Sequence, residues 1–171
     1  MSDAFWTARP WEESDHAFIV ETWLSSVEPS TAGARARATP YLLEKNRELG
    51  GIVHDAHFVH LRPLVSEILS RVTVVVACMA DEPSVVLGWC AAERHRTGCL
   101  VVHYAYVRPR YQRMGIGTAL VEGALLRLAD GNVQEQVVVS AMTRPARKTV
   151  ASRGWIHVPI EAFTRRENRR S

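Results

Sequence analysis

Residues 107–120 read Val-Arg-Pro-Arg-Tyr-Gln-Arg-Met-Gly-Ile-Gly-Thr-Ala-Leu, the most informative segment of the chain for its architecture. The run before it, residues 100–107, is rich in β-branched and aromatic side chains, which predicts a strand that the following proline ends. From Gly117 onward, apolar residues recur at three- and four-residue intervals up to position 128, the spacing of an amphipathic helix. The sequence therefore predicts a strand, a turn and a helix that begins at Gly115 and Gly117.

The position of these two glycines suits the binding of a phosphate group. The first turn of a helix leaves backbone N–H groups unpaired and carries about half a positive charge, and glycine lets an anion approach the backbone closely. A tight turn without a ligand is the alternative explanation. Neither the Walker A pattern nor the dinucleotide fingerprint fits, because no Gly-Lys-Ser/Thr follows and Leu120 replaces the third glycine.

The segment resembles the signature of the GCN5-related N-acetyltransferases (GNAT). Their Gln/Arg-x-x-Gly-x-Gly/Ala motif is matched here by Gln112, Gly115 and Gly117, with Val107 and Pro109 upstream. The resemblance implies an α/β fold with a mixed, mostly antiparallel sheet of six to seven strands, flanked by helices and splayed at the acyl-CoA site. It also implies that acetyl-CoA serves as co-substrate. Independently of the resemblance, we expect no metal, because the cysteines and histidines lack the spacing of metal ligands.

The resemblance further implies where acetyl-CoA binds. The pantetheine arm would lie in the gap between the splayed strands, with backbone groups of Val107 near its acyl end. Main-chain N–H groups of the loop would surround the pyrophosphate, and Arg113 or Arg110 would pair with phosphate charge; an exposed arginine without a ligand is the alternative. The expected cofactor-binding residues are Tyr106, Val107, Gln112, Arg113, Met114, Gly115, Ile116, Gly117 and Thr118.

A second match to the family covers residues 143–155. Many members show Asn-x-x-Ala, then a tyrosine, then Gly-Phe, and here Ala146 and Gly154 keep that spacing while Thr143 replaces the asparagine. Val150 occupies the place of the tyrosine that protonates the leaving thiolate. Either another side chain donates this proton, or the thiolate takes it from water.

The candidate catalytic residues lie on the strand before the loop. His103 stands where some family members, notably those acting on arylalkylamines, carry a catalytic histidine, and its ordinary pKa suits proton transfer near neutral pH. Strand alternation predicts that His103 shares a face with Ala105 and Val107, opposite the two tyrosines. The predicted catalytic residues are His103 and Tyr104.

Other assignments remain open for both roles. A hydrogen-bonded core histidine and an aromatic core tyrosine are the structural alternatives. Tyr106 could replace Tyr104 as the acid, and Glu93 could act through a water molecule.

These features predict an N-acetyltransferase that moves an acetyl group from acetyl-CoA to a primary amine by direct attack within a ternary complex. The acceptor is open among small molecules, proteins and nucleic-acid-linked amines, the last because 19 of the 21 basic residues are arginines. The alternative is a non-catalytic CoA-binding or nucleic-acid-associated interaction module with the same fold.

Length and composition favour a single domain that spans residues 1–171, because a chain of this length that is 47% hydrophobic can bury a substantial core. The net charge of +3 is only a mild basic bias. Three cysteines without paired metal spacing argue against a zinc site and predict buried thiols. With no membrane-length apolar run and no signal-peptide pattern, we expect a cytoplasmic protein, with a homodimer as one option. Residues 165–171 are expected to form a disordered basic tail.

The remaining elements follow from periodicity and turn residues. An amphipathic helix after Glu12–Asp15 is expected to bury Ile19, Val20, Trp23 and Leu24. Strands are predicted at residues 5–9, 72–80, 85–93, 99–107, 136–142 and 155–158, further helices at 41–49, 54–71 and 146–152, and a mobile connection at 30–39.

Overall fold

The computed structural model describes residues 4–26, 62–129, 136–141 and 144–158. Within them, six strands form one open sheet in sequence order: β1 (Trp6–Pro10), β2 (Thr73–Met79), β3 (Val86–Arg94), β4 (Leu100–Val107), β5 (Val137–Val139) and β6 (Ile156–His157). The helices are α1 (His16–Ser26), α4 (Ile116–Leu128), α5 (Arg144–Arg153), a helix at residues 62–69 and the 3₁₀ turns η1 (Glu13–Asp15) and η2 (Pro109–Tyr111).

The sheet is mixed. Strands β1 to β4 pair antiparallel with their neighbours, whereas β5 pairs parallel with β4 and β6 pairs parallel with β5. Parallel neighbours need a crossover connection, and the chain segments carrying α4 and α5 supply the two crossovers. A mixed, mostly antiparallel sheet flanked by helices confirms the predicted fold class.

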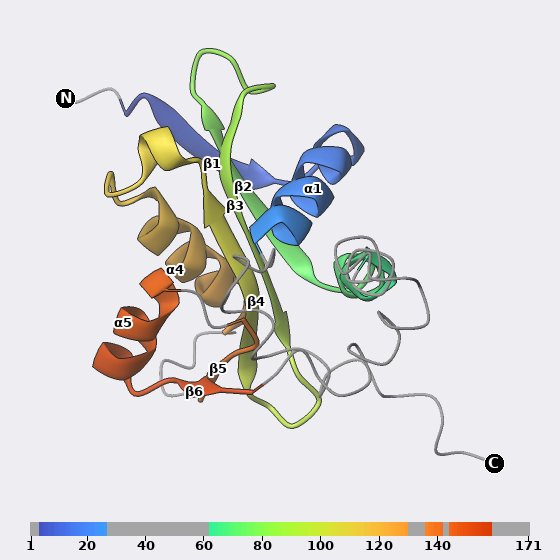
Figure 1. Cartoon of the computed structure of the whole chain (residues 1–171), viewed down its shortest axis with the longest axis vertical. Coiled ribbons are helices and arrows are strands. Elements are labelled where there is room, and N and C mark those ends of the chain that lie inside the picture. The colour runs from blue at the N-terminus through green and yellow to red at the C-terminus, as the bar shows by residue number, and fades with distance from the viewer. Residues whose placement is uncertain (1–3, 27–61, 130–135, 142–143, 159–171) are drawn as a thin grey trace, which may run out of the picture.

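Helices cover the sheet on both faces (Figure 1). On one face, α1 and the helix at 62–69 bury Trp23 and Ile68 against Trp89 of β3. On the opposite face, α4 buries Ile116 and Leu120 in a second cluster. Because full burial of a leucine-sized side chain stabilises a fold by about 1.5–3 kcal/mol, these two layers fix the helices on the sheet.

Strand β2 is buried on both faces, which explains its nearly continuous apolar sequence. Val74 and Val76 belong to the cluster under α1, while Val75 and Ala77 belong to the cluster under α4. The prediction of a strand covered on both faces is confirmed.

The first helix buries all four residues predicted for its apolar face, each of them at most 2% exposed. Its start is tied to β1 by the Arg9 guanidinium, which donates to both carboxylate oxygens of Asp15 at 2.7 and 3.0 Å. The buried Asp15 carboxylate also accepts the Glu12 backbone N–H at 2.8 Å. Burial tends to raise the pKa of Asp15, but these hydrogen bonds outweigh it and hold the pKa below its usual value.

One feature of β4 differs from the prediction. Val102 and Tyr104 lie opposite consecutive residues of β3, so His103 is an extra residue in the ladder, a β-bulge. The bulge interrupts the two-residue alternation, and the expectation that His103 shares a face with Ala105 and Val107 is wrong. Those two residues pack in the α4-side cluster, whereas His103 is hydrogen-bonded to Glu93.

Most remaining elements lie within a few residues of their predicted bounds, although β5 is shorter than predicted. Cys78 and Cys90 are buried as expected, while Cys99 is only half-buried just before β4. The predicted connection at 30–39, the helix at 41–49, the first part of the helix at 54–71 and the tail at 165–171 lie outside the described residues.

Candidate functional site

The sheet opens between β4 and β5. The two strands pair only as far as Val102 and Val139, and Ser140 N–H donates one more bond to the Val102 carbonyl at 3.0 Å. Strand β4 then continues to Val107 without pairing to β5, and a cleft of about 990 Å³ lies where the pairing is absent. The splay predicted for an acyl-CoA site is therefore present.

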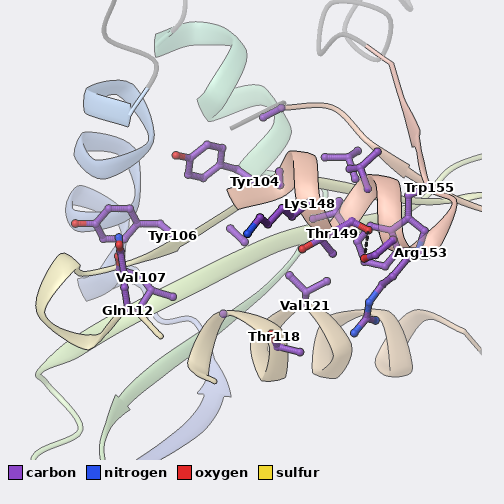
Figure 2. Close-up of a pocket in the computed structure, with 18 of the residues that line it drawn as sticks. Tyr104, Tyr106, Val107, Gln112, Thr118, Val121, Lys148, Thr149, Arg153 and Trp155 are labelled. Atoms are coloured by element: carbon purple, nitrogen blue, oxygen red, sulfur yellow. Dashed lines mark hydrogen bonds between the residues drawn. The ribbon is translucent and has the colours of Figure 1, made fainter. Parts of the chain in front are cut away.

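The cleft reaches both faces of the sheet. In Figure 2, Thr118 and Val121 line it from α4, while Lys148 and Thr149 line it from α5 on the opposite side. Tyr104 and Tyr106 also line it, but their rings extend toward α1 (Figure 2) and pack with the α1-side cluster. A long, thin ligand can therefore enter beside α4 and α5 and end near the face covered by α1.

The loop between η2 and α4 forms one end of the cleft. Two residues there have backbone in the left-handed region, Gly115 at φ 80° and Arg113 at φ 68°. Such a conformation is uncommon for a residue with a side chain, and residues held in it tend to cluster at ligand-binding and active sites. Backbone that alternates between right- and left-handed conformations can turn N–H groups to one side and form an anion-binding nest. The N-terminus of the 13-residue α4 adds its positive dipole at the same place.

Contacts on both sides of the end of β4 fix its position beside the loop. The Gln112 side-chain amide donates to the Val107 carbonyl at 3.1 Å, which joins the loop to the end of β4. On the other side of β4, Gly88 pairs with Val107, and a Cβ atom at Gly88 would lie only 2.5 Å from the Tyr106 carbonyl oxygen. The glycine therefore lets β3 approach the strand that carries the site.

Among the described residues that line the cleft, the charged side chains are all basic: Arg113, Lys148 and Arg153. Arg153 also pairs with Glu122 of α4 at 2.7 Å and lies over the ring of Trp155, 5.4 Å from its centroid. This charge distribution suits an anionic ligand, because cations beside a partly enclosed cleft attract phosphate groups.

A buried polar network lies at the base of the cleft. The His103 ring bonds through Nε2 to Glu93 at 3.0 Å and through Nδ1 to the Ser140 hydroxyl at 3.0 Å. The second carboxylate oxygen of Glu93 accepts a hydrogen bond from Arg71, at the end of the helix at 62–69. Burial of Glu93 tends to raise its pKa, but the bonds from His103 and Arg71 outweigh burial and lower the pKa to about 2.

Residues 45–155 match the family model described as the Acetyltransferase (GNAT) family, which is more than half of the chain. The chain belongs to the GNAT acetyltransferase family. Among curated proteins, none matches this sequence significantly.

Solved structures similar to this GNAT chain share its fold at low sequence identity. A GNAT-family acetyltransferase from Staphylococcus aureus Mu50 superposes with a TM-score of 0.56 at 10% identity, covering 86% of this chain and 81% of the other. A histone acetyltransferase HPA2 and related acetyltransferase from Corynebacterium glutamicum gives 0.55 at 13% identity, with 88% and 84% covered. A proposed acetyl transferase from Pyrococcus furiosus gives 0.53 at 20% identity, with 88% and 92% covered.

Most of the residues predicted for the GNAT cofactor loop lie at the cleft. Ile116 is instead buried beneath the loop, and Met114 is 55% exposed outside the cleft, so these two could face a ligand only through their backbone. Arg110 lies over the Tyr111 ring and does not line the cleft. The predicted residues that do line it are Tyr106, Val107, Gln112, Arg113, Gly115, Gly117 and Thr118.

The two predicted GNAT catalytic residues are placed differently. Tyr104 lines the cleft but is only 5% exposed, with its ring centroid 5.6 Å from that of Trp23 and 5.4 Å from that of Trp89. His103 is fully buried and does not line the cleft. The structure therefore brings Tyr104, but not His103, to the cleft that the loop residues form.

Lys148 and Arg153 line the cleft but are not among the site residues predicted from the sequence. Both lie on α5, and Arg153 follows Ala146 and Val150 at helical spacing along the side that lines the cleft. The second family match already placed Ala146 near the site, so this periodicity could have identified Arg153. Lys148, one of only two lysines in the chain, has no such signal in its spacing.

Within the described residues, no three or more His, Cys, Asp or Glu side chains are grouped so as to hold a metal ion. In the same part of the chain, no helix has both the length and the apolar character needed to cross a membrane.

The Glu93 network predicts a specific dependence of stability on pH. Because the folded-state pKa of Glu93 lies below its ordinary value of 4.5, its ionised form stabilises the fold above about pH 4.5, and this stabilisation is lost as pH falls toward 2. One pKa unit corresponds to about 1.4 kcal/mol, so Glu93→Gln should lower the free energy of unfolding by about 3 kcal/mol at pH 7. Urea denaturation should show nearly the full deficit at pH 7 and pH 5 and a clearly smaller deficit at pH 3.

The control for this experiment is Glu67→Gln, which replaces an exposed carboxylate on the helix at 62–69. Its effect on the free energy of unfolding should be small at each pH. A deficit in Glu93→Gln that stays constant from pH 7 to pH 3 would contradict the assignment of an ionised, buried Glu93.

Proposed function

We propose that this protein transfers an acetyl group from acetyl-CoA to a primary amine by direct attack within a ternary complex. The observation that carries the proposal is the cleft that passes through the splayed sheet, with a positively polarised loop at one end. Acetyl-CoA has the matching form, since it carries phosphates at one end of a long, thin arm and a reactive thioester at the other.

The charges around the cleft support the orientation of this ligand. The loop from Gln112 to Thr118 would take the pyrophosphate, with Arg113 beside it, while Lys148 and Arg153 approach from α5. The pantetheine arm would follow β4 toward Tyr106, in the gap that β5 leaves open. The amine would then meet the thioester on the face covered by α1.

The reaction needs two proton transfers. The neutral amine nitrogen attacks the thioester carbon, the new C–N bond forms, the C–S bond breaks, and the amine nitrogen gives up a proton. The CoA thiolate leaves and must take a proton, but Val150 lines the cleft where family resemblance would place a tyrosine. Tyr106 is the better placed replacement, since it is half-buried, whereas Tyr104 is almost fully buried and packs against two tryptophans.

Binding of acetyl-CoA is the first test, and isothermal titration calorimetry measures it directly. Gly115→Glu should abolish binding, because it places a carboxylate at the N-terminus of α4 where the pyrophosphate would lie. The matched control is Gly98→Glu, since Gly98 has a similar φ of 89° and equally open space around its Cβ but lies in the turn between β3 and β4. The control should bind as the wild type does; equal loss in both variants, or no binding by the wild type, counts against the cofactor site.

The second test measures acetyl transfer itself. Thiol release from acetyl-CoA should be measured with a panel of primary amines that includes a polyamine, a lysine peptide and an aminoacylated nucleic acid. With the best acceptor, Tyr106→Phe should lower kcat on the order of a hundredfold, as expected for loss of a general acid, without weakening acetyl-CoA binding. Tyr104→Phe should lower kcat much less, and the reverse order would make Tyr104 the proton donor.

The alternative function is a CoA-binding module without catalysis, and Val150 at the cleft is the observation that favours it. Such a module would bind acetyl-CoA in the first test and release no thiol with any amine in the second.

A further inference from the structure

Four polar side chains from four parts of the fold form one connected network. It runs from Arg71, after the helix at 62–69, through Glu93 on β3 and His103 on β4 to Ser140, just after β5. His103 is fully buried, and Ser140 and Glu93 are 4% and 8% exposed. The proposed reaction makes no direct use of these groups, because none of them lines the cleft.

The network lies where the two strands separate. His103 is the bulged residue of β4, and Ser140 directly follows the last residue of β5 that pairs with β4. The Ser140 hydroxyl also contacts the His103 carbonyl oxygen at 3.2 Å, and its backbone N–H bonds to the Val102 carbonyl. Ser140 therefore joins β5 to both the backbone and the side chain of the bulge.

The residues that follow the network on each strand form the base of the cleft. Tyr104 comes directly after His103, and Ala141 comes directly after Ser140. Both line the cleft, and both pack against the cluster on the α1 side. Any change in the Ser140–His103 contact would therefore move the two walls of the cleft relative to each other.

Hydrogen bonds suit this task better than apolar packing alone. A hydrogen bond restricts both distance and angle, so three polar contacts between two strands fix their separation and register. The bulge places a polar side chain and a backbone carbonyl in the interior, and the network supplies partners for both groups. Glu93 in turn is oriented by Arg71, which connects the network to the helical layer.

We propose that Ser140 and His103, oriented by Glu93, are positioning residues that fix where β5 leaves β4 and so hold the thioester in line with the incoming amine. This inference rests on the proposed acetyl transfer. It assigns His103 a role through the strands that it joins rather than through contact with substrate. A misplacement of reacting atoms by about 1 Å can lower a rate on the order of a hundredfold, so a small shift of the strands is enough to matter.

The first experiment compares Ser140→Ala with Cys90→Ala. Cys90 is equally buried, but it lies in the α4-side cluster away from the network, so its truncation controls for loss of a buried atom. With acetyl-CoA and the best amine of the panel, Ser140→Ala should lower kcat on the order of a hundredfold while acetyl-CoA affinity, measured by calorimetry, stays close to that of the wild type. An unchanged kcat, or equal losses in the two variants, would overturn the proposal.

A second pair of variants separates positioning from proton transfer. The amide of His103→Gln can still donate to Glu93 and keeps a polar group beside Ser140, whereas the side chain of His103→Leu offers neither. A positioning role predicts that the glutamine variant keeps far more activity than the leucine variant and retains the pH profile of the wild type. Equal inactivation of both variants, or a pH profile that changes in the glutamine variant, would identify His103 as a base instead.

Hydrogen exchange on the protein without ligand tests the same claim independently of acetyl transfer. Ser140→Ala should speed amide exchange at residues 102–107 and 137–141 and leave exchange in β1 and β2 unchanged, because the lost contact joins only β4 and the chain after β5. If the wild type fails to bind acetyl-CoA, the proposed function fails, whereas unchanged exchange in Ser140→Ala would show that the network does not hold the strands.

Discussion

The separation of β4 from β5 is the constraint on which the rest of the site depends. These strands pair over only three positions, and the cleft begins where their pairing ends. An unpaired stretch inside a sheet would normally leave buried backbone groups without partners. Here the Gln112 amide donates a hydrogen bond to the Val107 carbonyl, and the Ser140 hydroxyl donates one to the His103 carbonyl. These side chains replace part of the backbone hydrogen bonding that a neighbouring strand would supply.

The layers around the sheet allow this opening without loss of the core. The cluster under α1 and the cluster under α4 are centred on β2, β3 and the first half of β4, so most of the buried area lies away from the cleft. The half of the sheet that contains the cleft can therefore remain open while the other half maintains the fold. Two basic residues of α5, Lys148 and Arg153, line the side of the cleft opposite α4 (Figure 2).

Much of this arrangement could be predicted from the sequence, because local patterns determine it. The loop at 107–120 carries its own turn and helix signals, and the helical spacing around Trp23 identified a buried face that the structure confirms. The role of His103 could not be read in the same way. A bulge depends on the register between two strands, and the bonds to Glu93 and Ser140 join residues 10 and 37 positions away, which no local pattern encodes.

A crystal structure of the protein with acetyl-CoA tests the central claim most directly. We expect the pantetheine arm to lie between β4 and the chain after β5, with the pyrophosphate against the backbone of residues 112–118 and the thioester near Tyr106. Acetyl-CoA bound outside this cleft, or a complex in which residues 103–107 of β4 pair with the chain after β5, would contradict the proposed site.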